Sequence, residues 1–391
     1  MREHHIPEYS LFFLFRALLF PLLFFMPVLL EEKGITGWRT GLLIGEAYIT
    51  GILLTVPHGI LNDRVQSRRL ILVSLILASL FLFLLTQVSA FGVMLLLFLL
   101  FGVARNLFQI SFDSLFFKQV IRGEGCVHVG RYCLVFSSAA ILGFALTSAL
   151  LSRWPLYSLY IIAGILYGLT TALTFFLRVN ETRRVALSEY AGGLGGWRAA
   201  ALLFILFLFS LHWGAEDTCY GLFLKHYLGL SPSLSALYMG AEFITFGLTA
   251  YGTGLMVDRR GWEMRKVFLA GIVLSGLSLI LQVNRSFEIS LAMRMLHGMG
   301  DALVMVIIYY GISRAFHVDR MGGHMSLVMV ILLLGSFTGS LVYSRVGKTF
   351  GYETSFLVSG VIMLVTAFLL ITYFLSAGRG LNPAVSEKKP E

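Results

Sequence analysis

The residues of this chain that could do chemistry are histidines and charged residues that lie inside long apolar runs. In one run Arg294, His297 and Asp301 are spaced three and four residues apart, so a helix would place all three on one face. In another run His212 and Glu216 are four residues apart and share a helix face in the same way. Imidazole and carboxylate groups placed together can bind and release protons, and an arginine beside them can hold a negatively charged group.

Other apolar runs also contain isolated ionisable or polar side chains. These are Arg16, Glu46, Arg105, Gln109, Asp113, Asp217 and Glu242. An ionisable side chain at membrane depth costs several kcal/mol unless it is paired or hydrated, so such residues are candidates for function.

The elements that must position these residues are membrane-spanning helices. The chain has 391 residues, of which 57% are hydrophobic and only 13% are charged, whereas a soluble domain has about 25% charged residues. A helix needs ~20 apolar residues to cross ~30 Å of hydrocarbon. Twelve runs meet this requirement: 8–31, 39–61, 70–89, 91–117, 131–152, 156–177, 199–227, 232–256, 266–284, 287–315, 323–345 and 352–376. We therefore predict an all-α polytopic membrane protein with twelve transmembrane helices.

A short charged stretch occurs twice, each time between two of these apolar runs. Gly59 and Asp63 of the first copy correspond to Gly254 and Asp258 of the second copy, 195 residues later. A repeat of half the chain length indicates two related halves. The predicted domains are an N-terminal six-helix bundle at 1–177, a cytoplasmic linker at 178–198, a C-terminal six-helix bundle at 199–376 and a cytoplasmic tail at 377–391.

Both copies resemble the signature loop of the major facilitator superfamily, which joins the second and third helices of each half and reads Gly-x3-Asp-Arg/Lys-x-Gly-x-Arg-Arg/Lys. The second copy keeps the Gly, the Asp, the Arg and the second Gly, whereas the first copy has Gln66 in place of that second Gly. The resemblance extends over roughly residues 8–376. It implies two pseudo-symmetric six-helix bundles and a transporter that works by alternating access.

In that family, helices 1, 4, 7 and 10 line a central cavity, helices 2, 5, 8 and 11 flank it, and the other four face lipid. The interior charges of this chain fall in predicted helices 1, 2, 4, 7, 8 and 10, in agreement with this partition. The residues expected to line the cavity and bind the substrate are Arg16, Arg105, Gln109, His212, Glu216, Arg294 and His297. An apolar wall favours the protonated form of a carboxylate. The expected proton carriers are Glu216, Asp301, Glu46 and Glu242.

The resemblance also implies a gate in the duplicated loops. In the family the loop acid meets the N-terminus of a helix in the opposite half, which is helix 11 for Asp63 and helix 5 for Asp258, where the helix dipole favours a carboxylate. The arginines of the loops are expected to add salt bridges, and simple anchoring at a positive inner surface is the alternative for them. The predicted gating residues are Gly59, Asp63, Arg64, Arg68, Gly254, Asp258, Arg259 and Arg265.

The stretch that begins at Arg294 resembles a second family motif, Arg-x-x-Gln-Gly-x-Gly, with His at the Gln position. In the family this motif marks helix 4, where its Arg is linked to proton coupling, but helix 4 of this chain keeps only Gly102. Aligning the two helices puts Arg105 opposite Asp301. We therefore hypothesise that Arg105 and Asp301 form a charge contact across the cavity, with a fixed bridge inside one half as the alternative.

Several candidates also have a purely structural interpretation. Glu46 and Glu242 lie nearer the outer ends of their helices, where water at the cavity mouth could hydrate them. Arg16 lies about two turns into its helix and could extend to the inner bilayer surface. His212 could be a hydrogen-bonded packing residue, and Asp217 could point away from its neighbour and support helix packing only.

Lysine and arginine are distributed unevenly between the two sides of the predicted bundle. With both termini inside, the inner segments contain 20 of these residues, the outer loops 7 and the helix interiors 3. This is the positive-inside pattern of a multi-pass protein of the cell membrane with cytoplasmic termini. Topology therefore explains the net charge of +9, and we expect no nucleic-acid partner.

We predict a secondary active transporter, not an enzyme, that couples the symport of a small solute to the proton gradient. The interior arginines favour an anionic solute, and the interior acids leave cationic and zwitterionic solutes open. The alternative is a proton-coupled efflux antiporter of drugs or amphiphilic metabolites. Phe144 disfavours it, because family antiporters have Pro at this position of a helix-5 motif. The expected partners are a small-molecule substrate and the lipid bilayer, and we expect a monomer with no cofactor and no metal ion.

Two further alternatives are an intramembrane aspartyl protease and a sensor that binds a solute without moving it. Residues 298–301 read Gly-Met-Gly-Asp, as in such proteases, but the chain has no Tyr-Asp pair for the second catalytic aspartate. Three cysteines are too few and too scattered for a disulfide framework or a metal cluster.

Overall fold

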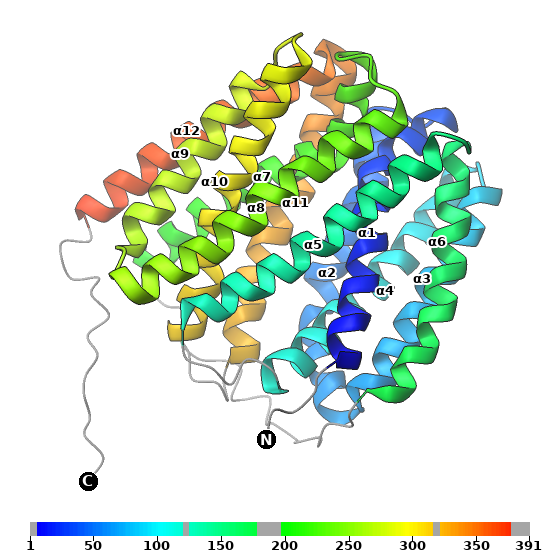
Figure 1. Cartoon of the computed structure of the whole chain (residues 1–391), viewed down its shortest axis with the longest axis horizontal. Coiled ribbons are helices and arrows are strands. Elements are labelled where there is room, and N and C mark those ends of the chain that lie inside the picture. Colours follow the sequence, from blue (N-terminus) through cyan, green and yellow to red (C-terminus); the bar gives the residue numbers. More distant parts are fainter. Residues whose placement is uncertain (1–5, 120–124, 178–196, 316–320, 377–391) are drawn as a thin grey trace.

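The computed structural model describes residues 6–119, 125–177, 197–315 and 321–376, and all regular structure in these ranges is helical. The first half contains α1 (Ile6–Glu32), α2 (Trp38–Arg64), α3 (Ser67–Gln87), α4 (Phe91–Gln119), α5 (Cys126–Leu151), α6 (Leu156–Thr170) and the short 3₁₀ helix η1 (Thr171–Phe176). The second half contains α7 (Trp197–His226), α8 (Pro232–Arg260), α9 (Met264–Leu281), α10 (Phe287–Ala315), α11 (Met321–Phe350) and α12 (Tyr352–Ser376). The prediction of an all-α chain with twelve long helices is confirmed in the described residues (Figure 1).

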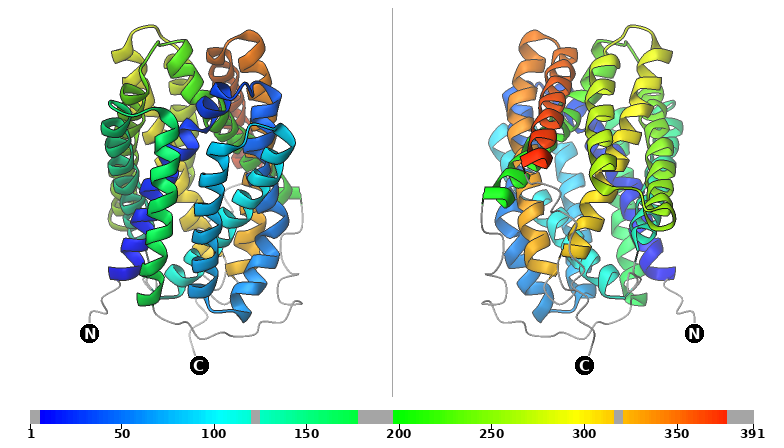
Figure 2. Two further views of the ribbon diagram at one scale, coloured as in Figure 1. Left: turned by 90° about the vertical axis from the view of Figure 1, so that its right-hand side faces the viewer. Right: turned by 90° about the vertical axis from the view of Figure 1, so that its left-hand side faces the viewer.

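The helices of the two halves, α1 to α6 and α7 to α12, form two bundles that lie against each other (Figure 1, Figure 2). Between the bundles, α5 runs beside α8, α2 packs against α11, and α1 packs against α7. The predicted tail and most of the predicted linker lie outside the described residues. α7 begins at Trp197, inside the range predicted for the linker.

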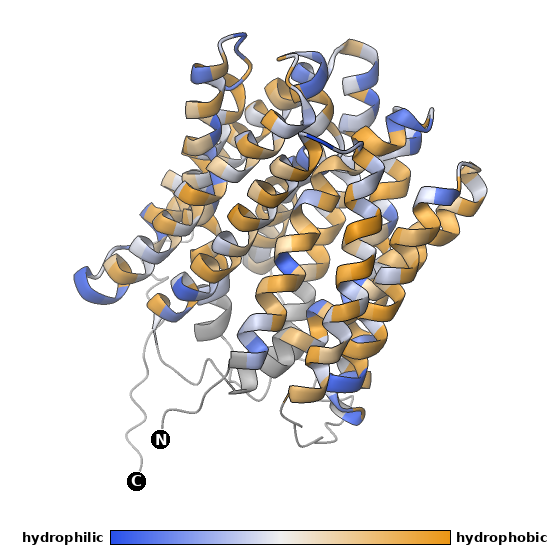
Figure 3. Cartoon of the chain, turned by 45° about the vertical axis from the view of Figure 1, so that its right-hand side comes forward, coloured by the Kyte–Doolittle hydropathy of each residue, from blue (hydrophilic) through white to orange (hydrophobic). Residues whose placement is uncertain are grey.

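Most of the helices have the composition of membrane spans. In the described part of the chain, 11 helices are long and apolar enough to cross a membrane. α8 does not reach this hydropathy, because it contains Glu242, several glycines and a charged C-terminal end. Outward-facing positions carry large apolar residues, such as Leu169 at 66% exposure and Phe368 at 64%. Figure 3 shows apolar residues along the body of the bundle and hydrophilic residues mainly near helix ends, as expected for a protein surrounded by lipid.

Small residues allow α5 and α8 to pack closely. A Cβ atom added at Gly130 would lie 2.7 Å from the carbonyl oxygen of Ala250, and one added at Gly247 would lie 2.8 Å from Cβ of Ser137. Larger side chains at these glycines would push the two helices apart. The bundles are therefore joined along α5 and α8 by direct helix contact.

Two helices extend five residues beyond one end of the apolar runs predicted for them. α5 begins at Cys126, whereas its apolar run predicted a start at residue 131. α11 continues to Phe350, whereas its apolar run predicted an end at residue 345. The added turns contain polar residues such as His128 and Lys348. Counting apolar residues finds the part of a helix inside hydrocarbon, so it misses turns that continue past the bilayer.

The two copies of the repeated loop differ in backbone conformation. α8 is followed by Gly261 with φ 62° and ψ 35°, a left-handed conformation that favours glycine. At the equivalent position Gln66 has φ −57° and ψ 125°, which any residue can adopt. The first copy therefore has no need for the glycine that it lacks.

Candidate functional site

Arg294 on α10 is the centre of a buried charge cluster in the C-terminal half. Its guanidinium group binds the carboxylate of Glu216 on α7 and lies 2.6 Å from Oε2 of Glu242 on α8. It also lies over the ring of Tyr220, 4.2 Å from the ring centroid. Arg294 is only 2% exposed, so the two carboxylates and the aromatic ring replace the water that would otherwise stabilise its charge.

Asp301, about two turns farther along α10, belongs to a second group of polar side chains. One of its carboxylate oxygens lies 3.1 Å from Nε2 of His212 on α7. The other accepts a hydrogen bond of 2.8 Å from the hydroxyl of Ser275 on α9. The indole N–H of Trp213 points to the same carboxylate at 3.4 Å. Asp301 is therefore held entirely by residues of its own half.

His297 connects the two groups. Its Nε2 lies 2.9 Å from Oε1 of Glu216 and 3.7 Å from Oδ2 of Asp301, and its Nδ1 lies 2.9 Å from the hydroxyl of Ser275. The result is a continuous buried set of ionisable side chains, which we call the α7–α10 polar chain. Its members are Glu242, Arg294, Glu216, His297, Asp301 and His212.

The two helix faces predicted from residue spacing contact each other in this structure. Every residue of both faces is a member of the α7–α10 polar chain. Glu242, which was also considered as a hydrated residue at a cavity mouth, is instead 6% exposed and bound to Arg294. His212 is more than a packing residue, because its ring contacts a carboxylate inside the bundle.

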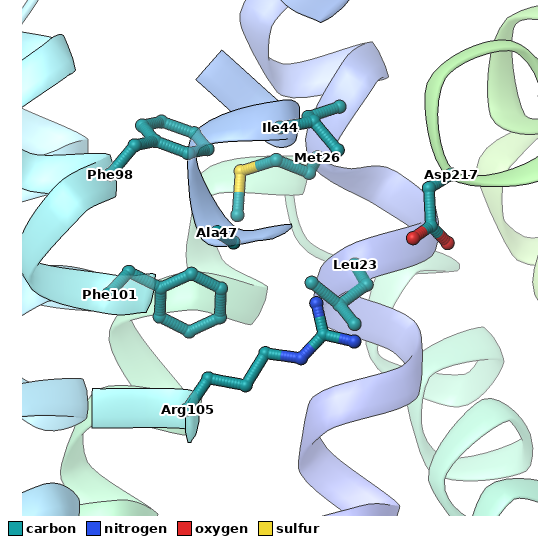
Figure 4. A pocket seen from close by; sticks show the side chains of 8 residues that line it. All are labelled: Leu23, Met26, Ile44, Ala47, Phe98, Phe101, Arg105 and Asp217. Atoms are coloured by element: carbon teal, nitrogen blue, oxygen red, sulfur yellow. The ribbon is translucent and has the colours of Figure 1, made fainter. Parts of the chain in front are cut away.

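Asp217 on α7 contacts the N-terminal half. It follows Glu216 by one residue and therefore points about 100° away around the helix. The hydroxyl of Tyr48 on α2 donates a hydrogen bond to Oδ2 of Asp217, and Arg105 on α4 lies 5.6 Å from the centroid of the Tyr48 ring. Figure 4 shows Arg105 and Asp217 in one small pocket between the halves. The other residues that line it are Leu23, Met26, Ile44, Ala47, Phe98 and Phe101.

The hypothesised contact between Arg105 and Asp301 is not formed in this structure. Asp301 is engaged by His212 and Ser275, whereas Arg105 shares its pocket with Asp217. Aligning two repeats gives the position of a residue along its helix but not the neighbours that its side chain reaches. Asp217 was a candidate with helix packing as its alternative and was not among the expected site residues, so the sequence did not predict its position at the interface between the halves.

Arg16 on α1 stays inside the N-terminal half. It donates a hydrogen bond to Oε1 of Gln109 on α4 and is 9% exposed. The rings of Phe12 and Phe136 lie 5.2 and 5.3 Å from its guanidinium carbon. The alternative that Arg16 extends to the bilayer surface is therefore wrong for this structure, because its charge is satisfied by an amide oxygen and aromatic faces.

Two predicted acids of the N-terminal half are not placed in a cluster. Glu46 on α2 is half-buried, and its Oε2 has no hydrogen-bond partner among the described residues. The side chain of Asp113 lies outside the described residues, so its predicted alignment with Arg105 and Gln109 is not described.

One end of the molecule carries the two repeated loops, and we call it the basic end. There, Oδ1 of Asp258 accepts a hydrogen bond of 2.9 Å from the backbone N–H of Cys126, and Oδ2 accepts one of 2.8 Å from that of Val127. A Cβ atom at Gly254 would lie 2.8 Å from the carbonyl oxygen of Cys126, so glycine permits this approach. Asp258 thus occupies the N-terminus of α5, the position that the family resemblance implied. The side chain of Asp63 lies outside the described residues.

The loop arginines contact aromatic rings of their own halves. Arg68 lies over the ring of Phe175 at 5.4 Å, and Arg265 lies over that of Phe374 at 5.6 Å. The predicted salt bridges of the loop arginines are not found among the ion pairs of the described residues. Of the predicted gating arginines, Arg64 and Arg259 are exposed.

A further contact joins the halves at the opposite end. Glu31 at the end of α1 accepts a hydrogen bond of 2.7 Å from Lys225 and lies 2.9 Å from Nε2 of His226, both at the end of α7. The sequence analysis did not predict these contacts, because charged residues near helix ends are common and do not by themselves indicate a contact between the halves. In this structure the halves are therefore bridged by charged side chains at both ends.

Comparison with known proteins identifies the family of the chain. The family model of the Major Facilitator Superfamily matches residues 9–223 and again 202–391. No curated protein matches the chain significantly.

Two solved structures have the same fold over nearly the whole chain. The crystal structure of the human organic anion transporter MFSD10 (TETRAN) has 19% sequence identity and a TM-score of 0.66, and the match covers 93% of this chain and 98% of that one. The nucleoside transporter NupG has 14% identity and a TM-score of 0.76, with 94% and 98% covered. Because the family matches together cover both bundles, the chain belongs to the Major Facilitator Superfamily and is a multi-pass membrane transporter, not an enzyme.

Proposed function

We propose that this protein is a secondary transporter that works by alternating access and couples the symport of a small solute to the proton gradient. The α7–α10 polar chain is the observation that carries this proposal. It contains three carboxylates but a single arginine, Arg294. With neutral histidines it would hold two unbalanced negative charges in a buried site, which is unfavourable. Protons on its histidines or carboxylates would remove this imbalance.

The position of Glu216 supports a link between protonation and movement of the halves. The side chain of Glu216 is 16% exposed, whereas that of His297 is 0% exposed, so Glu216 is the more accessible of the two. The next residue, Asp217, contacts Tyr48 of the other half. A movement of one half against the other would therefore change the surroundings of Glu216 and the number of protons that the polar chain holds.

The interior arginines favour a solute with a negatively charged or electron-rich group. Arg294 is bound by two carboxylates, and Arg105 faces Asp217. Arg16 has an amide partner, Gln109, and no carboxylate among the described side chains. We expect Arg16 to contact the solute, because its charge is the least neutralised of the three.

Proton-coupled uptake can be measured directly in proteoliposomes that contain a pH-sensitive dye. Nucleosides and small organic anions form the test panel, because these are the solute classes named for the two similar structures. At least one member is expected to acidify the vesicle interior when added outside, and Glu216→Gln is expected to reduce that proton influx about tenfold. Glu288→Gln changes an exposed acid in the first turn of α10 and should leave the influx unchanged. Alkalinisation on solute addition would indicate antiport, and solute uptake that is insensitive to the pH gradient would refute proton coupling.

We further propose that Asp258 is part of the gate at the basic end, which faces the cytoplasm in this proposal. Its two hydrogen bonds to the N-terminus of α5 join the halves. Hydrogen bonds to a charged group contribute about 1.5–3 kcal/mol each when buried, and less when partly exposed as here. Asp258→Ala is therefore expected to favour the open basic end by about 2 kcal/mol, or roughly thirtyfold in population.

The thiol of Cys126 can report this opening, because Cys126 is 0% exposed in the closed arrangement. In a background without the other two cysteines, Asp258→Ala is expected to raise the rate of maleimide labelling of Cys126 by roughly thirtyfold. Glu263→Gln removes a neighbouring exposed acid of the same loop and serves as the matched control. Equal labelling rates in the two variants would show that Asp258 does not hold the basic end closed.

A further inference from the structure

We propose that His212, Glu216, His297 and Asp301 form a binding site for one divalent transition-metal ion between α7 and α10. One ligand atom from each residue lies within 4.8 Å of the other three. Ligand atoms around a four-coordinate metal at ~2.0–2.1 Å are separated by about 3.3 Å, so small side-chain movements would close the site. The proposal concerns binding and does not depend on which solute the protein moves.

The hydrogen bonds behind both histidines direct the same ring nitrogen into the cluster. Nδ1 of His212 contacts the carbonyl oxygen of Phe209, which can only accept, so this nitrogen carries the proton. The hydroxyl of Ser275 donates to Asp301, so it accepts from Nδ1 of His297. In the neutral histidines Nε2 is therefore an unprotonated nitrogen in both cases. Histidine ligands of metals are typically held in this way by an oxygen on the outer side of the ring.

Each Nε2 atom faces carboxylate oxygen. That of His212 lies 3.1 Å from Asp301, and that of His297 lies 2.9 Å from Glu216. Nε2 of His297 is buried without a hydrogen bond of acceptable geometry in the described part of the chain, and the residue is 0% exposed. A nitrogen lone pair and a carboxylate repel each other unless a proton or a metal ion lies between them. The arrangement of these four groups therefore favours a bound cation.

The charges and the donor atoms indicate which cation fits. With neutral histidines, the three carboxylates and Arg294 leave two negative charges, which a divalent ion would neutralise. Calcium and magnesium prefer oxygen ligands, whereas two imidazole nitrogens and two carboxylates suit zinc, manganese, iron(II) and cobalt(II). Glu216 is the most exposed of the four side chains at 16%, so the ion would enter from its side.

The expectation of no metal ion rested on the scattered cysteines and overlooked a signal from the histidines. Inside its apolar runs the chain has a His followed four residues later by an acid twice, at His212–Glu216 and at His297–Asp301. A spacing of four residues places two ligands on one helix face, as in helical zinc sites. The two pairs lie 85 residues apart, so only the structure shows that they face each other.

Cobalt(II) is the probe for a direct test on the full-length, untagged protein in detergent after treatment with a chelator. Four-coordinate cobalt(II) absorbs visible light strongly and hydrated cobalt(II) weakly, so geometry can be read from the spectrum. We expect strong absorption that saturates at one ion per chain and is removed by zinc. A wild-type protein without this absorption, or with binding that never saturates, would overturn the proposal.

Variants separate this site from incidental binding at other histidines. His297→Gln and His212→Gln are each expected to weaken cobalt affinity by at least about 100-fold, and Ser275→Ala, which removes a positioning hydroxyl, by about tenfold. His58→Gln replaces a buried histidine of the N-terminal half, which contacts Asn106 of the same half. This variant is expected to bind cobalt like the wild type. If His297→Gln binds cobalt as tightly as His58→Gln, the ion lies elsewhere.

Two measurements on the same protein separate the two proposals. One is the cobalt titration, and the other is the proton-flux assay in chelator-containing buffer. Proton influx without cobalt binding would refute the metal site alone. Saturable cobalt binding without proton influx would refute the proposed coupling alone.

Discussion

Replacing Arg294 with glutamine is expected to lower the free energy of unfolding by about 3–5 kcal/mol and to abolish proton-coupled uptake. Arg294 is 2% exposed and is the cation that Glu216 and Glu242 share. Glutamine fills similar space but leaves two carboxylates without a positive partner inside the bundle. Removing one member of a buried ion pair costs more than removing both, because the remaining charge stays buried.

The double variant tests this explanation. Adding Glu242→Gln to Arg294→Gln removes one of the stranded charges and is expected to recover a large part of the lost stability, although not transport. Arg345→Gln changes an exposed arginine on α11 and is expected to stay within about 0.5 kcal/mol of the wild type. Thermal unfolding in detergent measures all of these proteins. If Arg294→Gln is as stable as Arg345→Gln, the buried charge cluster does not stabilise the C-terminal half.

The sequence predicted the two helix faces that make up most of the α7–α10 polar chain, because the signal for each face is local, but it did not predict that the faces meet. Side chains three or four residues apart share a helix face whatever the rest of the fold does. Both faces lie within long apolar runs and therefore at membrane depth. Ionisable side chains at that depth are expected to face the protein interior, not the lipid. Glu242 belongs to the cluster but lies on a third helix, α8. The residue spacing in α8 does not show whether Glu242 is buried in a cluster or hydrated at a cavity mouth, the two possibilities also considered for Glu46.

Contacts between the halves could not be predicted in the same way. Tyr48 reaches Asp217, and Glu31 reaches Lys225, across 169 and 194 residues of sequence. Such contacts depend on how one bundle is rotated and shifted against the other, which helical spacing does not encode. Asp258 is the exception, since the repeated loop and its family resemblance together supplied its partner helix.

Alanine at Arg105 or at Asp217 is expected to reduce solute uptake about 100-fold, while the double variant loses little more than either single one. These residues bring opposite charges into one pocket between the halves, and Tyr48 donates a hydrogen bond to the acid. Each single change leaves the other charge of the pocket without its opposite charge, and a 100-fold loss corresponds to about 3 kcal/mol. Uptake rates of the four proteins form a double-mutant cycle, and we expect a coupling free energy of about 2–3 kcal/mol. Strict additivity would show that Arg105 and Asp217 act independently.

The same cycle with Asp301 in place of Asp217 distinguishes the two partners considered for Arg105. In this structure Asp301 is held by His212 and Ser275, so Arg105→Ala and Asp301→Ala are expected to be additive within about 0.5 kcal/mol. Coupling to Asp301 that exceeds coupling to Asp217 would contradict this expectation. Asp301 would then have to leave its histidine and meet Arg105 in another conformation of the transport cycle, because its carboxylate cannot reach both sets of partners at once.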